Sequence, residues 1–366
     1  ESLSTNIGGD FMRKLALILH RAEVTTREYL EITGKSYGVF DYLSLKEDIK
    51  NVVSGNKACI IEKEFETVEE TLTSMNERGI GFITWHDSEF PENLRQIPDP
   101  PYLLYYMGCI DIIDSFSISI IGSRSPTVYG IFAASKFSRE LALRSVVTVS
   151  GFAKGIDTEC HKSTHQAGGK TIAVLGTSFD NIYPRSNIKF LSELINSGSL
   201  ILSEYPVGIE SRPYHFVKRN RIISGISYGT LVIEAGEKSG TLTTVDFALE
   251  QGKTVFAVPG NINSKNSFGT NNLIKYGAKP ATDIQDIIEE FPDACFVQNN
   301  QKKDSSLSET EKMIINTLND KGVQNIEKNL VIFPIYRYIK LKYNELRKKA
   351  KIIYFREERG NAAKDS

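Results

Sequence analysis

Six short apolar runs, rich in β-branched residues, alternate with longer helical stretches between residues 117 and 258, and this alternation constrains the fold more than any other feature. Short runs that are apolar throughout are typical of parallel strands, which crossover helices bury on both faces. The predicted strands cover residues 117–121, 146–149, 171–175, 200–202, 230–233 and 254–258. Together they predict an α/β fold with a doubly wound, mostly parallel sheet of the Rossmann-like kind.

The segment that precedes the strands predicts helices. Residues 12–78 contain Thr25 followed by Glu28, which has the form of a capping box. We predict a small helical N-terminal domain over 12–78, similar to SAM or helix-hairpin-helix domains. Its stretch around Gly34 and Gly38 looks like a helix-turn-helix, but short helical pairs are more often packing modules than DNA readers.

The segment that follows the sheet domain loses the strand-helix rhythm. We place the sheet domain at 80–292 and a polar, charged linker at 293–306. A C-terminal unit is expected over 307–366, where Ser308 and Glu311 mark a helix start and the later part carries mostly Lys and Arg. This unit is predicted to be a helical tail or the remnant of a small nucleic-acid-binding domain.

Composition excludes several classes of protein. Hydrophobic residues make up 40% and charged residues 24% of the 366, as in folded globular chains. No apolar run approaches the roughly 18 residues of a spanning helix and no secretory signal is visible, so we expect a cytoplasmic protein with no membrane partner. The four cysteines show no paired spacing, which predicts reduced thiols rather than disulfides or a zinc site.

Charge is distributed unevenly along the chain. Residues 120–280 hold 18 Lys and Arg against 11 Asp and Glu, a net of about +7, whereas the whole chain has a formal net charge of −1. A region that faces a polyanion would have this excess, and so would an ordinary solvated basic face. The count alone leaves both interpretations open.

Most of the predicted strands end in turns that contain glycine. In a parallel sheet these turns share the edge where helix N-termini present free N–H groups, and glycine lets a ligand oxygen approach the backbone closely. A single turn of this kind usually has a steric origin, but a series of them favours an anion site. The residues predicted to support phosphate are Gly151, Gly155, Gly176, Ser239, Gly240 and Thr241, with further turns at Gly122, Gly236 and Gly260.

Nucleotide cofactors are disfavoured. The first strand is not followed by Gly-x-Gly-x-x-Gly, the second ends in Ser150-Gly151 rather than in an acidic residue, and no P-loop motif occurs. We therefore expect no cofactor.

Metal binding and catalysis are also the weaker interpretations of the polar residues. Asp157, His161 and His165 share one helical face, where a hydrogen-bonded role in support of the glycine turn is favoured over metal ligation. Glu234 follows a strand and is either a catalytic carboxylate or a structural acceptor, the latter favoured.

The segment from Arg212 to Arg221 is the most polar one between strands. Its basic side chains suit phosphate, and the rings of Tyr214, His215 and Phe216 suit stacking on unpaired bases, which is how single strands are held without sequence readout. Pairing of Arg219 or Arg221 with Glu204 or Glu234 inside the fold is the competing interpretation.

The chain resembles the DNA-processing protein A family, also called DprA or Smf, through ordered motifs that span about residues 80–280. They are Ile121-Gly122-Ser123-Arg124, Ser150-Gly151-Phe152-Ala153-Lys154-Gly155-Ile156-Asp157, Ser203-Glu204-Tyr205-Pro206, Phe216 with Arg219-Asn220-Arg221, Ser239-Gly240-Thr241 and Val258-Pro259-Gly260, with Asp99-Pro100-Pro101 upstream. Ser178 departs from the glycine that is usual after the third strand. The C-terminal unit begins like a winged helix and does not continue as one from about Leu330, which would make it degenerate.

The resemblance implies an extended Rossmann domain that binds single-stranded DNA, forms a homodimer and loads RecA recombinase during natural transformation and recombination, with no catalytic step. The DNA-binding positions it implies are Gly122, Ser123, Arg124, Lys154, Arg185, Arg212, Phe216, Arg219, Asn220 and Arg221. The alternatives are a nucleotide-processing hydrolase of the phosphoribohydrolase-like Rossmann type, with Glu234 as the acid, and an interaction protein that does not use its basic edge.

Overall fold

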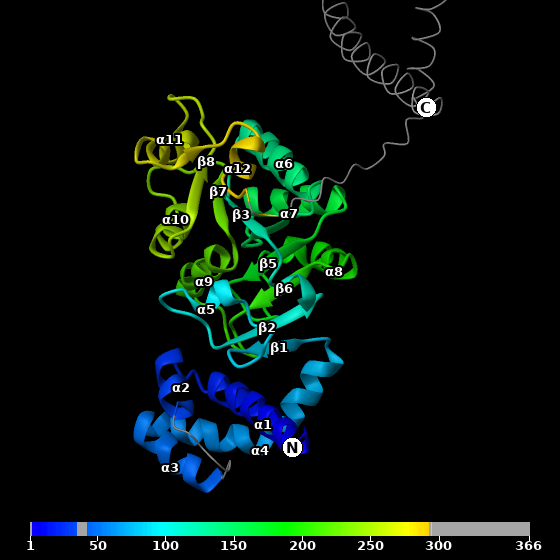
Figure 1. Ribbon diagram of the computed structural model, residues 1–366, viewed down its shortest axis with the longest axis vertical. Coiled ribbons are helices and arrows are strands. Elements are labelled where there is room, and N and C mark those ends of the chain that lie inside the picture. The colour runs from blue at the N-terminus through cyan, green and yellow to red at the C-terminus, as the bar shows by residue number, and fades with distance from the viewer. Residues whose placement is uncertain (1, 35–41, 293, 295–366) are drawn as a thin grey trace, which may run out of the picture. The chain divides into compact units, whose positions relative to one another are not determined.

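The computed structural model describes residues 2–34, 42–292 and 294 (Figure 1). Gly38, Cys295, the linker apart from Ala294 and the C-terminal unit at 307–366 lie outside the described residues. The described part belongs to one compact unit. It contains no helix whose length and apolar character would allow it to cross a bilayer.

A nine-stranded sheet forms the centre of the described part, in the order β1-β2-β6-β5-β4-β3-β7-β8-β9. Strands β3 to β8 pair in parallel, whereas β1 with β2 and β2 with β6 pair antiparallel. The sheet is therefore mostly parallel, which confirms the predicted fold class. The strands are β1 Gly81–Thr84, β2 Leu103–Gly108, β3 Ser117–Ile121, β4 Val147–Ser150, β5 Thr171–Leu175, β6 Leu200–Ser203, β7 Gly229–Val232, β8 Thr254–Ala257 and β9 Lys279–Pro280.

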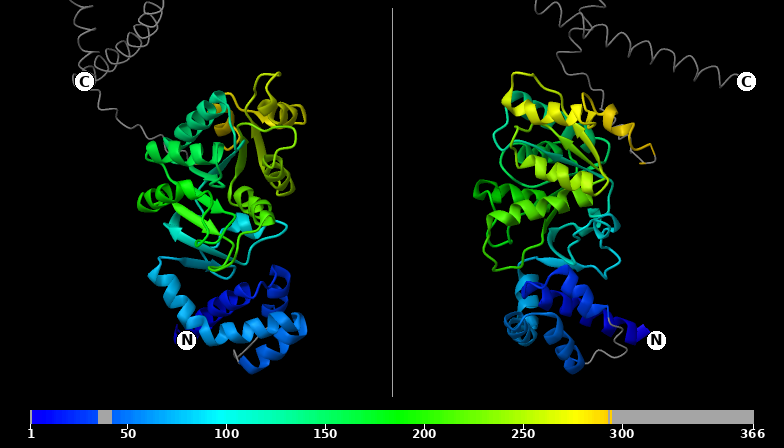
Figure 2. Two further views of the ribbon diagram at one scale, coloured as in Figure 1. Left: turned by 180° about the vertical axis from the view of Figure 1, so that it is seen from behind. Right: turned by 90° about the vertical axis from the view of Figure 1, so that its left-hand side faces the viewer.

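Helices cover both faces of the sheet, as the views in Figures 1 and 2 show. One face packs Ile118 and Ile120 of β3 against α6, α7 and α12, and the other packs Val147 and Val149 of β4 against α5, α9 and α10. The helices that follow the first predicted strand are α6 Val128–Ala142, α7 Ile156–Gln166, α8 Ile188–Asn196, α9 Pro213–Ile226, α10 Thr241–Glu250, α11 Phe268–Lys275 and α12 Gln285–Ile288, and α5 is Glu92–Arg95. Three short 3₁₀ helices accompany them, at Ile110–Ile112, Arg185–Asn187 and Lys265–Ser267.

The N-terminal segment is helical, with α1 Ser2–Arg21, α2 Thr26–Thr33, α3 Tyr42–Val52 and α4 Gly55–Glu77. The capping box of α2 is confirmed: the Glu28 amide donates to Thr25 Oγ1 (3.2 Å), and the Thr25 amide donates to Glu28 Oε2 (2.7 Å). Helix α1 begins ten positions before the predicted start of the helical segment. The ring of Tyr29 stacks on Tyr102 at 4.1 Å, so the helices share a core with the sheet.

The predicted strands differ from the observed strands in some of their end residues, and the structure contains three strands that the sequence did not predict. Strands β4 and β7 are shifted by one residue, and β1, β2 and β9 were not predicted. Strand β2 had a detectable signal, an apolar run that ends at Gly108, whose φ of +95° is compatible with glycine. β9 has only two residues, both exposed, and no periodicity reveals so short a strand.

Candidate nucleic-acid interface

The carboxyl ends of the parallel strands meet at one edge of the sheet, where the chain order reverses between β3 and β7. Such a reversal is where α/β sheets bind ligands. A pocket of about 390 Å³ lies at this point. We call it the switch-point pocket; its walls are residues 121–125, Ala153 and Asp157, one face of α9, and the turn at 239–241 with the start of α10.

The loops after β3 and β4 interlock at Gly155. This residue has a φ of +82°, and a Cβ placed on it would lie 2.3 Å from the backbone oxygen of Ser123. The Ile156 amide donates to that same oxygen (3.1 Å). Only glycine allows this approach, so the loop that carries Gly122, Ser123 and Arg124 is held against the start of α7.

Asp157 and Arg219 hold the turn at Gly151 from two sides. Asp157 Oδ2 accepts hydrogen bonds from the amides of Gly151 (3.1 Å) and Ala153 (3.3 Å). Arg219 Nη1 donates to the carbonyl oxygens of Gly151 (2.6 Å) and Val174. A Cβ on Gly151 would lie 2.7 Å from both charged groups, which explains the glycine.

These two charged side chains are buried. Burial lowers the pKa of Arg219 to about 10, an effect that the nearby Asp157 carboxylate opposes, so the guanidinium stays cationic at neutral pH. Burial raises the pKa of Asp157, while Arg219 and the two amides act in the opposite direction. Arg219 thus supplies a poorly hydrated positive charge to the wall of the pocket.

The turn before α10 forms one wall of the pocket. Ser239 Oγ accepts from the Thr241 amide (3.2 Å), and Asn220 Nδ2 donates to Thr243 Oγ1 (3.2 Å), which ties this turn to α9. Gly240 caps α10 and is exposed. A helix N-terminus of this kind favours negative charge.

A second cavity of about 1040 Å³ adjoins the first. We call it the aromatic groove; it is bounded by residues 180–188, by residues 210–217 and by Arg124. Arg124, Phe216 and Val217 line both cavities, so the two cavities adjoin at these side chains. Gly176 has no room for a Cβ, which would lie 2.8 Å from Phe216 Cδ1, and this close approach fixes the Phe216 ring.

Arginines border the aromatic groove and are open to solvent. Arg124, Arg185 and Arg212 are exposed and form no ion pair with any residue that the structure describes. Lys154 is exposed in the turn before α7 but lines neither cavity. Four of the predicted basic contacts are therefore exposed to solvent, and three of them line the aromatic groove.

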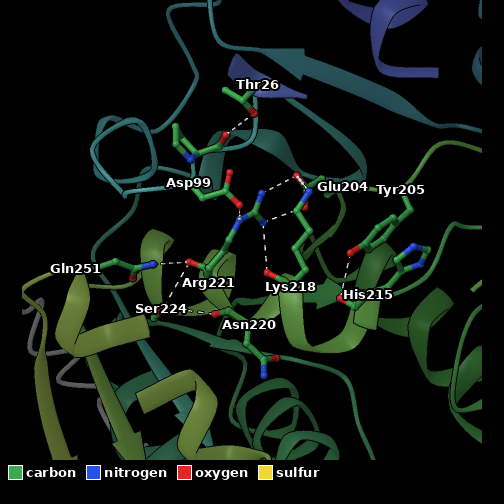
Figure 3. Close-up of polar contacts among 11 residues, drawn as sticks. Thr26, Asp99, Glu204, Tyr205, His215, Lys218, Asn220, Arg221, Ser224 and Gln251 are labelled. Atoms are coloured by element: carbon green, nitrogen blue, oxygen red, sulfur yellow. Dashed lines mark hydrogen bonds and ion pairs between the residues drawn. The ribbon is translucent and has the colours of Figure 1, made fainter. Parts of the chain in front are cut away.

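Arg221 requires a correction, because the structure does not place it at the interface (Figure 3). The residue is 2% exposed, and its guanidinium donates to Glu204 through Nη1 (2.9 Å) and Nη2 (2.6 Å), and to Asp99 through Nε (2.8 Å). Glu204 and Asp99 hold the pKa of Arg221 above its usual range despite burial. The competing interpretation, an internal pair with Glu204, holds for this residue, and we remove it from the candidate DNA contacts.

His215 is a structural residue rather than a stacking platform. It is buried, stacks on Tyr205 at 4.0 Å, and its Nδ1 accepts from the Arg212 amide (3.2 Å). Tyr214, by contrast, is exposed. Ser178, which stands in place of a glycine, is accommodated because it is buried and donates to the Ile209 carbonyl (3.1 Å).

The residues considered for metal and catalysis have structural partners. His161 Nδ1 lies 2.7 Å from Thr171 Oγ1, and His165 packs edge-on against Phe190. Within the described ranges no cluster of three metal-ligating side chains occurs. Glu234 accepts hydrogen bonds from Thr127 Oγ1 (2.5 Å), the Thr127 amide (2.9 Å) and Asn266 Nδ2 (3.3 Å). It lines a separate cavity of about 620 Å³ beside Tyr129.

The favoured interpretation of Asp157, a hydrogen-bonded face that supports the glycine turn, is confirmed by its bonds to the Gly151 and Ala153 amides. Sequence reasoning missed Tyr183, whose ring is exposed beside Phe216. An exposed aromatic next to Pro184 and Arg185 was the available signal.

The fold and the site define a Rossmann-like α/β protein with arginines and glycine-containing turns at the carboxyl ends of its parallel strands. The model of the family described as DNA recombination-mediator protein A matches residues 81–292. The chain therefore belongs to this family, which confirms the resemblance seen in the sequence.

Individual proteins named as DNA processing protein A are similar to this chain in sequence and in structure. The DNA processing protein DprA of Streptococcus pneumoniae is 38% identical over 275 residues, which cover 75% of this chain and 96% of that protein. Its solved structure matches with a TM-score of 0.65 at 33% identity, over the same shares of the two chains. A structure of DNA processing protein A from Helicobacter pylori, reported for its single-stranded DNA binding mode, matches with a TM-score of 0.52 at 31% identity, over 58% of this chain and 96% of that one.

Proposed function

We propose that this protein binds single-stranded DNA without sequence readout along the edge formed by the switch-point pocket and the aromatic groove. The observation that carries the proposal is the convergence there of glycine-containing turns, the buried Arg219 and the exposed Arg124, Arg185 and Arg212. Amides and arginines suit a phosphate backbone, and rings suit unpaired bases. The reported binding mode of the H. pylori relative supports this assignment.

Family membership supports a proposal for the wider role. We propose that the bound strand is protected and handed to RecA recombinase during natural transformation and recombination, that the protein acts as a homodimer, and that it performs no catalytic step. Glu234 gives little support to the hydrolase alternative, because its carboxylate already accepts three hydrogen bonds. Incubation of the protein with nucleotides is expected to release no free base, and release would favour the hydrolase.

The first test compares two exposed arginines. Arg124→Ala removes a cation that lines both cavities, and Arg139→Ala removes one at the last turn of α6 that lines neither. We expect Arg124→Ala to weaken binding of a mixed-sequence oligonucleotide about tenfold and to lower the slope of log K against log salt by about 0.7, the share of one phosphate contact on a single strand. Arg139→Ala should bind as wild type.

Fluorescence anisotropy at several salt concentrations measures both quantities. Absence of binding by the wild type at low salt would exclude the proposed function. Equal losses in the two variants would show that net charge, and not this edge, governs binding.

A further inference from the structure

The first two turns of helix α6 expose an apolar face that lies outside the switch-point pocket and the aromatic groove. Val128, Ile131 and Phe132 occupy positions i, i+3 and i+4, so they share one face of the helix. Val128 is 88% exposed and Phe132 is 64% exposed. Exposed apolar side chains that gather in this way mark a surface that another molecule covers.

The loop between β8 and α11 extends this face. Tyr129 donates its hydroxyl to the Pro259 carbonyl (2.8 Å), which holds the loop against the start of α6. Ile262 of the loop is 98% exposed. The cavity of about 620 Å³ beside Tyr129 lies between helix and loop, since Val128 and Asn261 both line it. We call the apolar face, Ile262 and this cavity together the α6 surface.

The cavity contains a polar group that lacks a partner. Ser267 lines the cavity and is 3% exposed, and its hydroxyl forms no hydrogen bond with any residue that the structure describes. Buried hydroxyl groups are nearly always hydrogen-bonded. An occupant that inserts a polar side chain into the cavity would therefore satisfy Ser267.

A nucleic-acid strand does not suit the α6 surface. The buried carboxylate of Glu234 accepts hydrogen bonds from the amide and the hydroxyl of Thr127, at the N-terminus of α6. A helix N-terminus favours an anion, and here the protein already supplies one. A phosphate at this cavity would be repelled by that fixed negative charge.

The charged residues around the α6 surface favour an acidic partner. Segments 122–134 and 259–268 contain only two charged residues, Arg124 and Lys265, and both are basic and exposed. Lys154, exposed in the turn before α7, adds a third cation. A second copy of this chain in a two-fold symmetric contact would bring these cations against themselves. A partner with carboxylates around an apolar stripe would neutralise them.

A protein helix fits this surface better than a lipid bilayer does. A bilayer would cover Val128 and Phe132, but it would neither fill the cavity nor supply a hydrogen bond to Ser267. An amphipathic helix presents apolar side chains at i, i+3 and i+4, and it can carry a polar side chain beside them.

We propose that the α6 surface docks an acidic amphipathic helix of another protein. The apolar stripe of that helix covers Val128, Phe132 and Ile262, one of its polar side chains enters the cavity beside Ser267, and its carboxylates meet Lys265. This docking does not depend on the proposed function, because none of these residues lines the two cavities assigned to DNA.

The experiment measures the binding of three synthetic peptides to the full chain by fluorescence anisotropy. The first is an acidic amphipathic helix of about four turns, with leucines at i, i+3, i+4 and i+7, one glutamine beside them and glutamates elsewhere. The second is a scrambled peptide of the same composition, and the third replaces each glutamate by lysine. We expect the acidic helix to bind at least about tenfold more tightly than the other two.

Two variants test the contacts of the peptide. Phe132→Ser removes an apolar anchor and Lys265→Glu reverses a flanking charge, and each is expected to weaken binding of the acidic helix about tenfold. Leu30→Ser is the matched control, since it removes a 41% exposed apolar side chain from α2. It should bind the peptide as wild type. Thermal melts check that each variant is folded.

Several results would overturn the docking. They are absence of peptide binding, equal binding of the scrambled peptide, and wild-type affinity in Phe132→Ser. Binding of phosphatidylglycerol vesicles that Phe132→Ser abolishes would assign the surface to a membrane instead. Self-association that Phe132→Ser abolishes in analytical ultracentrifugation would assign it to a second copy.

Oligonucleotide binding separates the docking from the proposed function. Phe132→Ser should bind a mixed-sequence oligonucleotide as the wild type does, because Phe132 lines neither DNA cavity. Failure of the wild type to bind the oligonucleotide would overturn the proposed function and leave the peptide result unaffected.

Discussion

Arg219 and Arg221 show how two identical residues in one motif acquire opposite roles. Residues 219 and 221 are two positions apart, and a step of two residues turns a helix by about 200°. Their side chains therefore leave opposite faces of α9. Arg219 reaches the carbonyls at the ends of β4 and β5, whereas Arg221 reaches Glu204 and Asp99. The sequence identified both as basic and left internal pairing open for either; it could not choose, because the choice depends on which acids the folded chain brings near.

Arg219→Lys tests whether this residue acts by charge or by geometry. A lysine keeps the positive charge, but its single ammonium lacks the planar fork with which Arg219 holds Gly151 and Val174 together. We expect the variant to bind a mixed-sequence oligonucleotide about tenfold more weakly, which is the contribution of one well-placed charged hydrogen bond. Circular dichroism should show that its fold is intact. Wild-type affinity in Arg219→Lys would mean that charge alone suffices.

Helix α9 joins the interface to a buried ionic network. One face carries Phe216 and Arg219 into the cavities, and the opposite face carries Arg221 onto Glu204 (Figure 3). Glu204 is 7% exposed and also meets Lys218 Nζ at 3.4 Å. Burial raises the pKa of Glu204, but the cations Arg221 and Lys218 outweigh it and hold that pKa below its usual value. The network therefore fixes the rotation of α9 about its axis.

Glu204→Gln tests the network through the pH dependence of stability. Because the folded pKa is lowered, the contribution of Glu204 is fully present above its unfolded pKa of about 4.5 and is lost as pH falls through the folded value. At pH 7 we expect a loss of about 3 kcal/mol in the free energy of unfolding, since Arg221 keeps a buried charge with one acid fewer. Urea unfolding at pH 7 and pH 4 measures this, and the loss should be smaller at pH 4. An equal loss at both pH values would show that the carboxylate charge is not what stabilises α9.

Among the secondary-structure elements, the sequence predicted the strands that are buried on both faces of the sheet. Every residue of β3 to β7 is buried, as are all residues of β8 except Thr254, and each predicted strand end lies within one residue of the observed end. Strand β1 carries only Phe82 and Ile83 between polar and glycine positions, and its edge place in the sheet depends on pairing with β2. Such pairing is a tertiary property that no local pattern contains.

For the whole molecule, the sequence suggested separate helical and sheet domains with a boundary near residue 79. The structure shows that both contribute to one core, in which Leu17 and Tyr29 of the helices are grouped with Tyr102 and Ala173 of the sheet. Tyr102 also donates its hydroxyl to the Val24 carbonyl (3.1 Å). Side chains of both segments are apolar in the sequence, but only the folded chain reveals that they bury one another.

Tyr29→Ala tests whether the helices and the sheet unfold together. The ring is fully buried and parallel to Tyr102 at an interplanar angle of 9°, so its removal opens a cavity between the two segments. We expect a loss of about 3 kcal/mol in the free energy of unfolding, as for other buried aromatic residues.

A shared core further predicts that helix content and oligonucleotide binding are lost at the same temperature, and that this temperature is lower in Tyr29→Ala than in the wild type. Circular dichroism during heating measures helix content, and fluorescence anisotropy measures oligonucleotide binding. Tyr276→Ala is the control, because Tyr276 is 80% exposed. Binding that persists after part of the helix signal has melted would instead establish the helical segment as an independent domain and restore the boundary that the sequence suggested.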